Sequence, residues 1–195
     1  MLATKQIRFK EANARPNPTM PNPISVLAIK TPGWQPHPPL RAGPEMAVLK
    51  RFNFDCIWRG TVQAGGMGPG SPEMIAHGKG VFRSIMDGAW LVGDFEQDQF
   101  VDGKIVITWK AHYVVGWDPG AQEYKITYAD NNGSATLMHG RVEGQHFIVE
   151  TEANAAVQLR LTWTIIRPGQ VRWRNECAVN GSPWLLVEEY LCVQR

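Results

Sequence analysis

The chain has 195 residues, of which 44% are hydrophobic and 19% charged, and its net charge is +2. This balance is ordinary for one globular domain with or without an arm, and it excludes an intrinsically disordered chain. The small charge is scattered along the sequence and produces no strong field, so we expect neither nucleic acid nor a membrane as a partner.

The N-terminal segment is rich in proline, with nine of the 14 prolines lying before Glu45. Each proline lacks a backbone donor, which predicts an extended arm over residues 1–43 and a separate domain over residues 44–195. The apolar stretch Ile24–Ile29 suggests that the arm packs on its own domain or on a second copy, giving a homodimer; a loosely ordered tail is the alternative. No apolar run follows the first charged residues, so we expect a cytoplasmic protein.

A short helix is predicted at the start of the second segment. Pro44 suits a first helical turn, and Met46, Leu49 and Phe52 recur at helical spacing. From Phe54 onward the sequence is made of β-forming segments separated by turn dipeptides. The predicted strands are Phe54–Gln63, Met74–Met86, Ala89–Gln99, Lys104–Trp117, Tyr124–Asp130, Ser134–Arg141, Gln145–Thr151, Val157–Ile166, Gln170–Val179 and Trp184–Val193.

The turns between these strands predict an antiparallel meander. Asp102-Gly103, Asn132-Gly133 and Glu143-Gly144 are all typical of short hairpins. A meander of about ten strands without covering helices must protect its edges, and closure does this most simply. The fold class is therefore predicted to be all-β, an up-and-down antiparallel barrel of about ten strands; a two-sheet sandwich is the alternative.

Alternation along the strands assigns side chains to the inside or the outside of the barrel. In Lys104–Trp117 the face that runs from Ile105 to Trp117 through every second residue is apolar and aromatic, so we place it inside. Tyrosine and tryptophan need polar partners when buried, whereas a filled core favours Val, Leu and Ile. The inner set therefore predicts a cavity that binds a ligand, and a filled core with a tryptophan plug is the alternative. The candidate ligand-binding residues are Trp109, Tyr113, Trp117, Tyr124, Tyr128, Trp163, Trp173 and Asn175.

The segment from Asp87 to Glu152 resembles a known family. "DGAWLVGDFE", "HYVVGWDPGAQEYKITYAD" and "LMHGRVEGQHFIVETE" follow in an order similar to the bacterial family called domain of unknown function 1579. The chain departs from the family at Trp117, where tyrosine is common, at Gln145, where aspartate is usual, and in its Pro-rich arm. The resemblance implies a lipocalin-like (calycin) barrel and carries no settled activity or catalytic residue.

Two classes of function are consistent with these patterns. The first is a binding module that holds a small hydrophobic or aromatic compound. The second is an isomerase, cyclase or lyase that uses Tyr113, His112 or Tyr128 as an acid–base group. Haem binding through one histidine is a third reading. His112 falls on the polar face, and a register error of one residue would turn it inward. No histidine or cysteine spacing matches a metal site, so we expect no metal and no cofactor.

Overall fold

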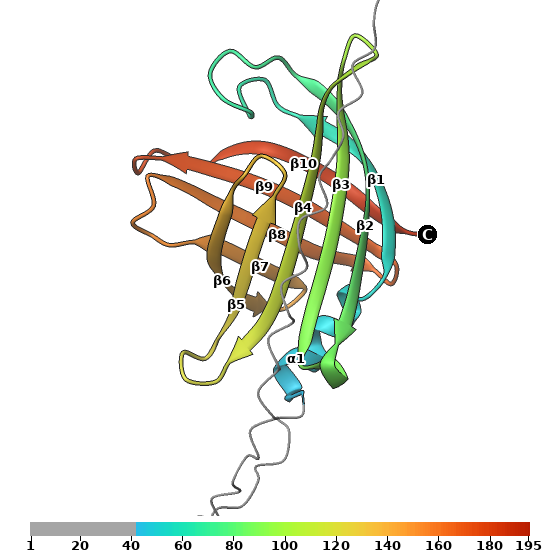
Figure 1. Ribbon diagram of the computed structural model, residues 1–195, viewed down its shortest axis with the longest axis vertical. Helices are drawn as coiled ribbons and strands as arrows, with labels where there is room; N and C mark the ends of the chain where they lie inside the picture. Colours follow the sequence, from blue (N-terminus) through green and yellow to red (C-terminus); the bar gives the residue numbers. More distant parts are fainter. Residues whose placement is uncertain (1–41) are drawn as a thin grey trace, which may run out of the picture. The chain divides into compact units, whose positions relative to one another are not determined.

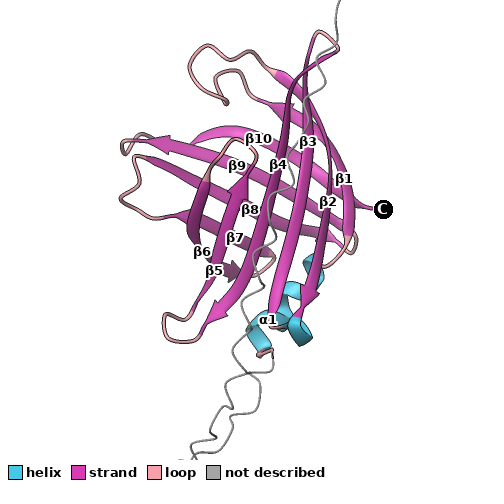
Figure 2. Ribbon diagram, in the orientation of Figure 1, coloured by secondary structure: helices cyan, strands magenta, loops and turns pink. Residues whose placement is uncertain are grey.

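The computed structural model describes residues 42–195, and the predicted arm with Ile24–Ile29 lies outside them. The described chain contains one α-helix, two short 3-10 helices and ten strands (Figures 1 and 2). The helical elements are α1 (Pro44–Leu49), η1 (Lys50–Phe52) and η2 (Met86–Gly88). The strands are β1 (Asp55–Val62), β2 (Met74–Ile85), β3 (Trp90–Val101), β4 (Lys104–Asp118), β5 (Glu123–Asp130), β6 (Ala135–Glu143), β7 (His146–Thr151), β8 (Val157–Arg167), β9 (Gln170–Val179) and β10 (Leu185–Gln194).

The strands form a closed barrel. Each strand pairs antiparallel with its neighbour in sequence, and β1 closes the barrel by pairing with β10. Val62, for example, lies opposite Met74 of β2 on one side and Glu188 of β10 on the other. The predicted up-and-down barrel is therefore confirmed, and the sandwich alternative is wrong because no sheet edge is left open.

Tight turns produce this topology as expected. Asp102 and Gly103 both have positive φ angles, of 48° and 75°, which suits the two-residue hairpin between β3 and β4. Between β4 and β5, the carboxylate of Asp118 accepts hydrogen bonds from the backbone N–H groups of Gly120 and Ala121, at 2.9 and 3.1 Å. This side chain fixes the turn within the stretch from His112 to Tyr124.

Burial follows the predicted alternation along most of β4. Ala111, Tyr113 and Val115 are buried, whereas Lys110 and His112 are exposed. Ile105, which was expected inside, is 55% exposed. The pairing with β3 shifts by one residue between Gln99 and Phe100, beside Ile105, so the simple alternation fails at this end of the strand.

The last strand, whose faces the sequence left ambiguous, contains a similar irregularity. Its pairing with β9 shifts between Leu186 and Glu188, and Val187 and Glu188 are both buried although they are adjacent. Beyond this point Tyr190 and Cys192 continue on the inner face. The bulge thus places a glutamate inside the barrel.

One end of the barrel is covered by α1 and η1, and the Gly-rich loop between β1 and β2 lies at the opposite end (Figure 1). The predicted helix over Pro44–Phe52 is present, although its last turn is a 3-10 helix. Three side-chain hydrogen bonds connect this cover to the rest of the barrel. The Tyr124 hydroxyl donates to the Glu45 carbonyl at 2.7 Å. In the turn between β6 and β7, the Gly144 carbonyl accepts from Arg51 Nη2 at 3.0 Å and Gln145 Oε1 accepts from Arg51 Nη1 at 3.5 Å.

Within residues 42–195, no helix has the length and apolar character that crossing a membrane would require.

Candidate functional site

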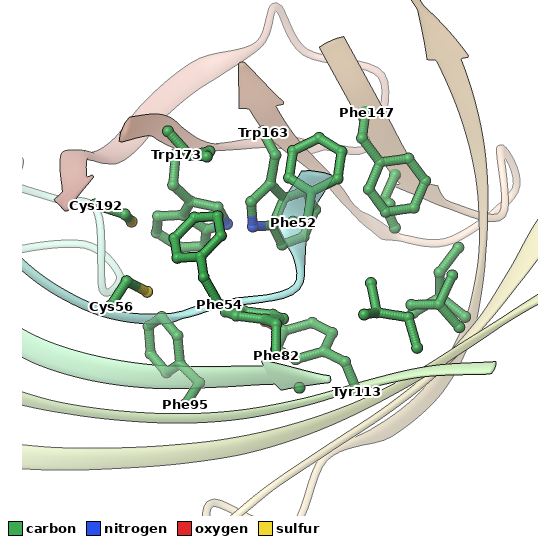
Figure 3. Close-up of a pocket in the computed structure, with 16 residues that line it drawn as sticks. Phe52, Phe54, Cys56, Phe82, Phe95, Tyr113, Phe147, Trp163, Trp173 and Cys192 are labelled. Atoms are coloured by element: carbon green, nitrogen blue, oxygen red, sulfur yellow. The ribbon is translucent and has the colours of Figure 1, made fainter. Parts of the chain in front are cut away.

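A cavity lies inside the barrel beneath α1 and η1. It is lined by 16 residues, none of which carries a charge, and half of them are aromatic (Figure 3). Phe52 and Phe54 extend into it from the covering segment, while Phe147 and Trp163 approach from β7 and β8. The cavity has a volume of about 40 Å³, room for a few water molecules or one small apolar group.

The aromatic side chains of the cavity contact one another at their edges. Trp163 and Tyr113 form a T-shaped pair at 6.2 Å between ring centroids, and Trp163 and Trp173 form another at 6.3 Å. Phe95 and Trp173 are 5.7 Å apart. Figure 3 draws the indole nitrogens of Trp163 and Trp173 turned toward one another. Such edge-to-face contacts fix the orientations of the rings, and the rings in turn determine the shape of the cavity wall.

Two glycines on neighbouring strands make room for large rings. A Cβ atom at Gly78 of β2 would lie 2.1 Å from the Trp58 ring, and one at Gly93 of β3 would lie 2.4 Å from the Phe82 ring. These rings therefore lie flat against the backbone of the barrel wall. These rings fill the space that a larger side chain would occupy at each glycine position. Part of their surface faces the cavity.

A stacked aromatic cluster separates this cavity from the other half of the barrel. Trp173, which lines the cavity, stacks on Tyr190 at 4.8 Å, and Phe95 stacks on Trp58 at 4.7 Å. Trp58 and Tyr190 also stack on each other, at 5.9 Å. Their polar atoms point away from the cavity, toward Gln97 and Glu188 respectively.

Glu188 is the centre of a buried hydrogen-bonded cluster behind these rings. Its carboxylate accepts from Gln97 Nε2 at 3.0 Å, from Asn175 Nδ2 at 3.3 Å and from the Tyr190 hydroxyl. Trp58 Nε1 donates to Gln97 Oε1 at 3.0 Å, which fixes the orientation of that amide. Burial raises the pKa of Glu188 to about 7, against the opposing effect of its hydrogen bonds to Gln97 and Asn175.

Several buried polar atoms near these two regions lack a partner. Both amide atoms of Gln99 are unpartnered although the side chain is 0% exposed, and so is Oδ1 of Asn175. In the cavity wall the Nε1–H of Trp173 is also unpartnered. Most buried polar groups in folded proteins form hydrogen bonds, so these atoms retain unused hydrogen-bonding capacity.

Two of the three free cysteines also line the cavity. Cys56 of β1 and Cys192 of β10 are buried there, whereas Cys177 is partly exposed and lies elsewhere. A hydrogen bond between the two thiols lowers the pKa of Cys56, and the same interaction together with burial raises the pKa of Cys192. Cys56 is thus the more readily ionised thiol of the pair.

Three of the eight ligand-binding candidates line the cavity, namely Tyr113, Trp163 and Trp173. Asn175 is buried, but it belongs to the polar cluster around Glu188. Trp109 is partly buried and contacts Phe95 at 6.2 Å from outside the cavity.

The remaining candidates lie elsewhere in the barrel. Trp117 and Tyr124 form a T-shaped pair at 4.9 Å, near the covering helix. The Tyr128 hydroxyl donates to Asp130 at 2.7 Å. His112 is on the outer face as expected from the alternation, and its Nδ1 is 2.7 Å from Asp94. The structure therefore does not bring these four side chains into the cavity.

Sequence reasoning missed much of the cavity wall. Phe52 was expected only as part of a helix core, and Phe54, Phe82, Phe95 and Phe147 were not singled out. An alternation of inner residues in β2 and β3 could have found Phe82 and Phe95. Phe52 and Phe54, at the end of the predicted helix, were a weaker signal for the cavity wall.

A closed ten-stranded antiparallel barrel with an internal apolar cavity defines a calycin-like barrel. More specifically, the chain belongs to the family described as "Protein of unknown function (DUF1579)", whose model matches residues 43–168. The earlier resemblance is thereby confirmed. No curated protein matches the chain.

Several solved structures share the fold, and two of them show the extent of the similarity. Rv2717c from M. tuberculosis is 15% identical with a TM-score of 0.59, covering 79% of this chain and 99% of that one. The S-type phycobiliprotein lyase CPES from Guillardia theta is 9% identical with a TM-score of 0.51, covering 76% of this chain and 91% of that one. At these identities the likeness establishes the architecture alone.

Proposed function

We propose that this protein binds a small, mostly apolar compound with aromatic character inside its barrel. The observation that carries the proposal is the cavity itself, which lies inside the barrel and is lined by uncharged side chains, half of them aromatic. Ligand sites of this kind are concave and apolar, with a few polar groups that orient the ligand. The Nε1–H of Trp173, which has no partner in the described residues, is such a polar group.

Entry of a ligand requires the cover to move. The closed cavity, with about 40 Å³ of free space, is smaller than a bicyclic compound needs. Phe52 and Phe54 fill part of the interior from a short segment that is joined to the strands by the hydrogen bonds of Tyr124 and Arg51. Displacement of these two phenylalanines would enlarge the site, so the segment from α1 to Phe54 acts as a lid.

Tryptophan fluorescence tests the proposal because Trp163 and Trp173 form part of the cavity wall. Titration with a panel of naphthalene and indole derivatives is expected to quench or shift the emission in a saturable manner. The Val149→Phe variant fills the cavity from β7 and is expected to lose the response while remaining folded. Unchanged emission of the wild-type protein with every compound would contradict the proposal.

The acid–base alternative has weaker support. His112 lies outside the barrel beside Asp94. Burial raises the pKa values of Tyr113 and Tyr128, which opposes loss of their protons. One protein of similar fold is a phycobiliprotein lyase, so an identified substrate whose turnover falls in Tyr113→Phe would revive this reading.

Haem binding also gains no support from the described residues, since none of the histidines in residues 42–195 lines the cavity. A Soret band after addition of haem would overturn this inference. The homodimer through the N-terminal arm stays a prediction, and a monomeric mass in sedimentation would reject it.

A further inference from the structure

Glu188 is a buried acid for which the described chain supplies no counter-charge. Its side chain is 0% exposed, and no Lys, Arg or His of residues 42–195 forms an ion pair with it. The groups that face it are Gln97 of β3, Asn175 of β9 and Tyr190 of its own strand, all of which donate hydrogen bonds to its carboxylate. This arrangement is suited to an anion, yet buried charges are normally paired with a charge of opposite sign.

The charge of Glu188 acts on the cavity through the aromatic cluster. Tyr190, which donates to the carboxylate, stacks directly on Trp173 of the cavity wall. Tyr113 lines the same cavity, and its pKa is raised by burial and, secondarily, by the negative charge of Glu188. Two charges inside a protein interact more strongly than the same two charges in water, because little solvent screens them.

The cavity wall is also suited to a cation. Trp173, Trp163 and Phe95 present aromatic rings there, and aromatic faces attract positively charged nitrogen atoms, tryptophan most strongly. A buried carboxylate without a counter-charge therefore lies behind aromatic rings of the cavity wall, since its partner Tyr190 stacks on Trp173. Together these observations favour a ligand group that carries positive charge.

We propose that the ligand of this barrel carries a positively charged nitrogen on its apolar body, and that Glu188 is the buried counter-charge that selects it. The inference rests on the proposed function of the cavity and specifies its ligand as an aromatic or aliphatic amine. Glu188 acts behind the rings, as an electrostatic determinant of specificity.

Two probes with the same body test the proposal, 1-naphthylmethylamine and naphthalene-1-methanol, each titrated calorimetrically into the wild-type chain at pH 8. The amine is expected to bind about tenfold more tightly than the alcohol, the order expected for one partly screened charge pair. In Glu188→Gln the preference is expected to fall to about twofold or less, with the affinity for the alcohol retained. The matched control Glu189→Gln changes the adjacent, exposed carboxylate and is expected to keep the full preference.

A pH comparison supplies a second measurement that needs no variant. At pH 5.5 Glu188 is largely protonated in view of its pKa of about 7, whereas the amine stays charged, so the wild-type preference is expected to shrink. Burial raises the pKa of Tyr113, so this residue stays neutral over this range. Equal binding of the two probes at pH 8, or a preference that survives in Glu188→Gln, would overturn the assignment of Glu188 while leaving the cavity proposal intact. Failure of both probes to bind would overturn both.

Discussion

Replacement of Glu188 by glutamine is expected to change how the stability of the barrel depends on pH. The carboxyl has an ordinary pKa of 4.5, and burial raises it to about 7 in the folded protein. The folded state therefore binds the proton more tightly than the unfolded state does. The contribution of the protonated acid to the free energy of unfolding is fully present below about pH 4.5. It is lost as the pH rises toward 7, and it does not change further above that value.

The magnitude follows from the same two values. A rise of the pKa from 4.5 to about 7 corresponds to about 3 kcal/mol of folding free energy, because each pKa unit is worth about 1.4 kcal/mol. Most of this change, roughly 2 to 3 kcal/mol, falls between pH 5 and pH 8. Glutamine has nearly the same shape and does not titrate, so Glu188→Gln is expected to lack this contribution. The variant should be more stable relative to wild type at pH 8 than at pH 5.

Urea unfolding at pH 5 and pH 8 measures the effect. Comparing the two proteins at each pH cancels the titration of all other groups and any constant cost of the altered hydrogen bonds to Gln97 and Asn175. The control Glu189→Gln, whose carboxylate is exposed, is expected to follow wild type at both pH values. An equal difference between wild type and Glu188→Gln at pH 5 and pH 8 would refute the reasoning, since it would mean that Glu188 does not titrate in this range.

Three further experiments probe the cavity and its cover. Gly78→Ala would place a Cβ atom 2.1 Å from the Trp58 ring and is expected to destabilise the barrel by about 1 to 3 kcal/mol in urea unfolding; an unchanged midpoint would contradict the close packing. Tyr124→Phe removes the hydroxyl that donates to the covering helix, so it should cost about 1 kcal/mol and speed ligand entry in stopped-flow mixing; equal entry rates would argue against a lid. Cys56 lines the cavity and Cys177 does not, so naphthalene-1-methanol should slow alkylation of Cys56 by N-ethylmaleimide, and equal protection of both thiols would place the ligand elsewhere.

The fold was predictable because its signals are local. Hairpin dipeptides such as Asp102-Gly103 require positive φ angles that few other residues adopt, and they recur at strand spacing along the chain. Period-two alternation then assigned Tyr113, Trp163 and Trp173 to the interior, where they are found. Closure followed from the need to protect the sheet edges.

The site was less predictable because alternation shows whether a side chain points into or out of the barrel. It does not show how far along the barrel axis that side chain lies. Trp109 shares an inner face of β4 with Tyr113, yet it lies further along the strand and does not line the cavity. Tyr128 of β5 pairs with Tyr113, and the two ring centroids are 5.1 Å apart, yet it does not line the cavity either. The bulge before Glu188 could not be read from the sequence, so its burial was hidden by the ambiguous alternation of β10. Contacts between elements distant in sequence, such as that of Phe52 in the cover with Phe147 in β7, form only once the barrel has closed.

The most direct test of the central claim is calorimetric titration of naphthalene-1-methanol into the wild-type chain and into Val149→Phe. Val149 is 1% exposed and lines the cavity, so a phenylalanine there occupies the proposed ligand space. Binding of one molecule per chain in the wild type, lost in the variant at unchanged fold by circular dichroism, is the predicted result. Absence of binding to the wild type, or equal binding to both proteins, would show that this cavity is not the ligand site.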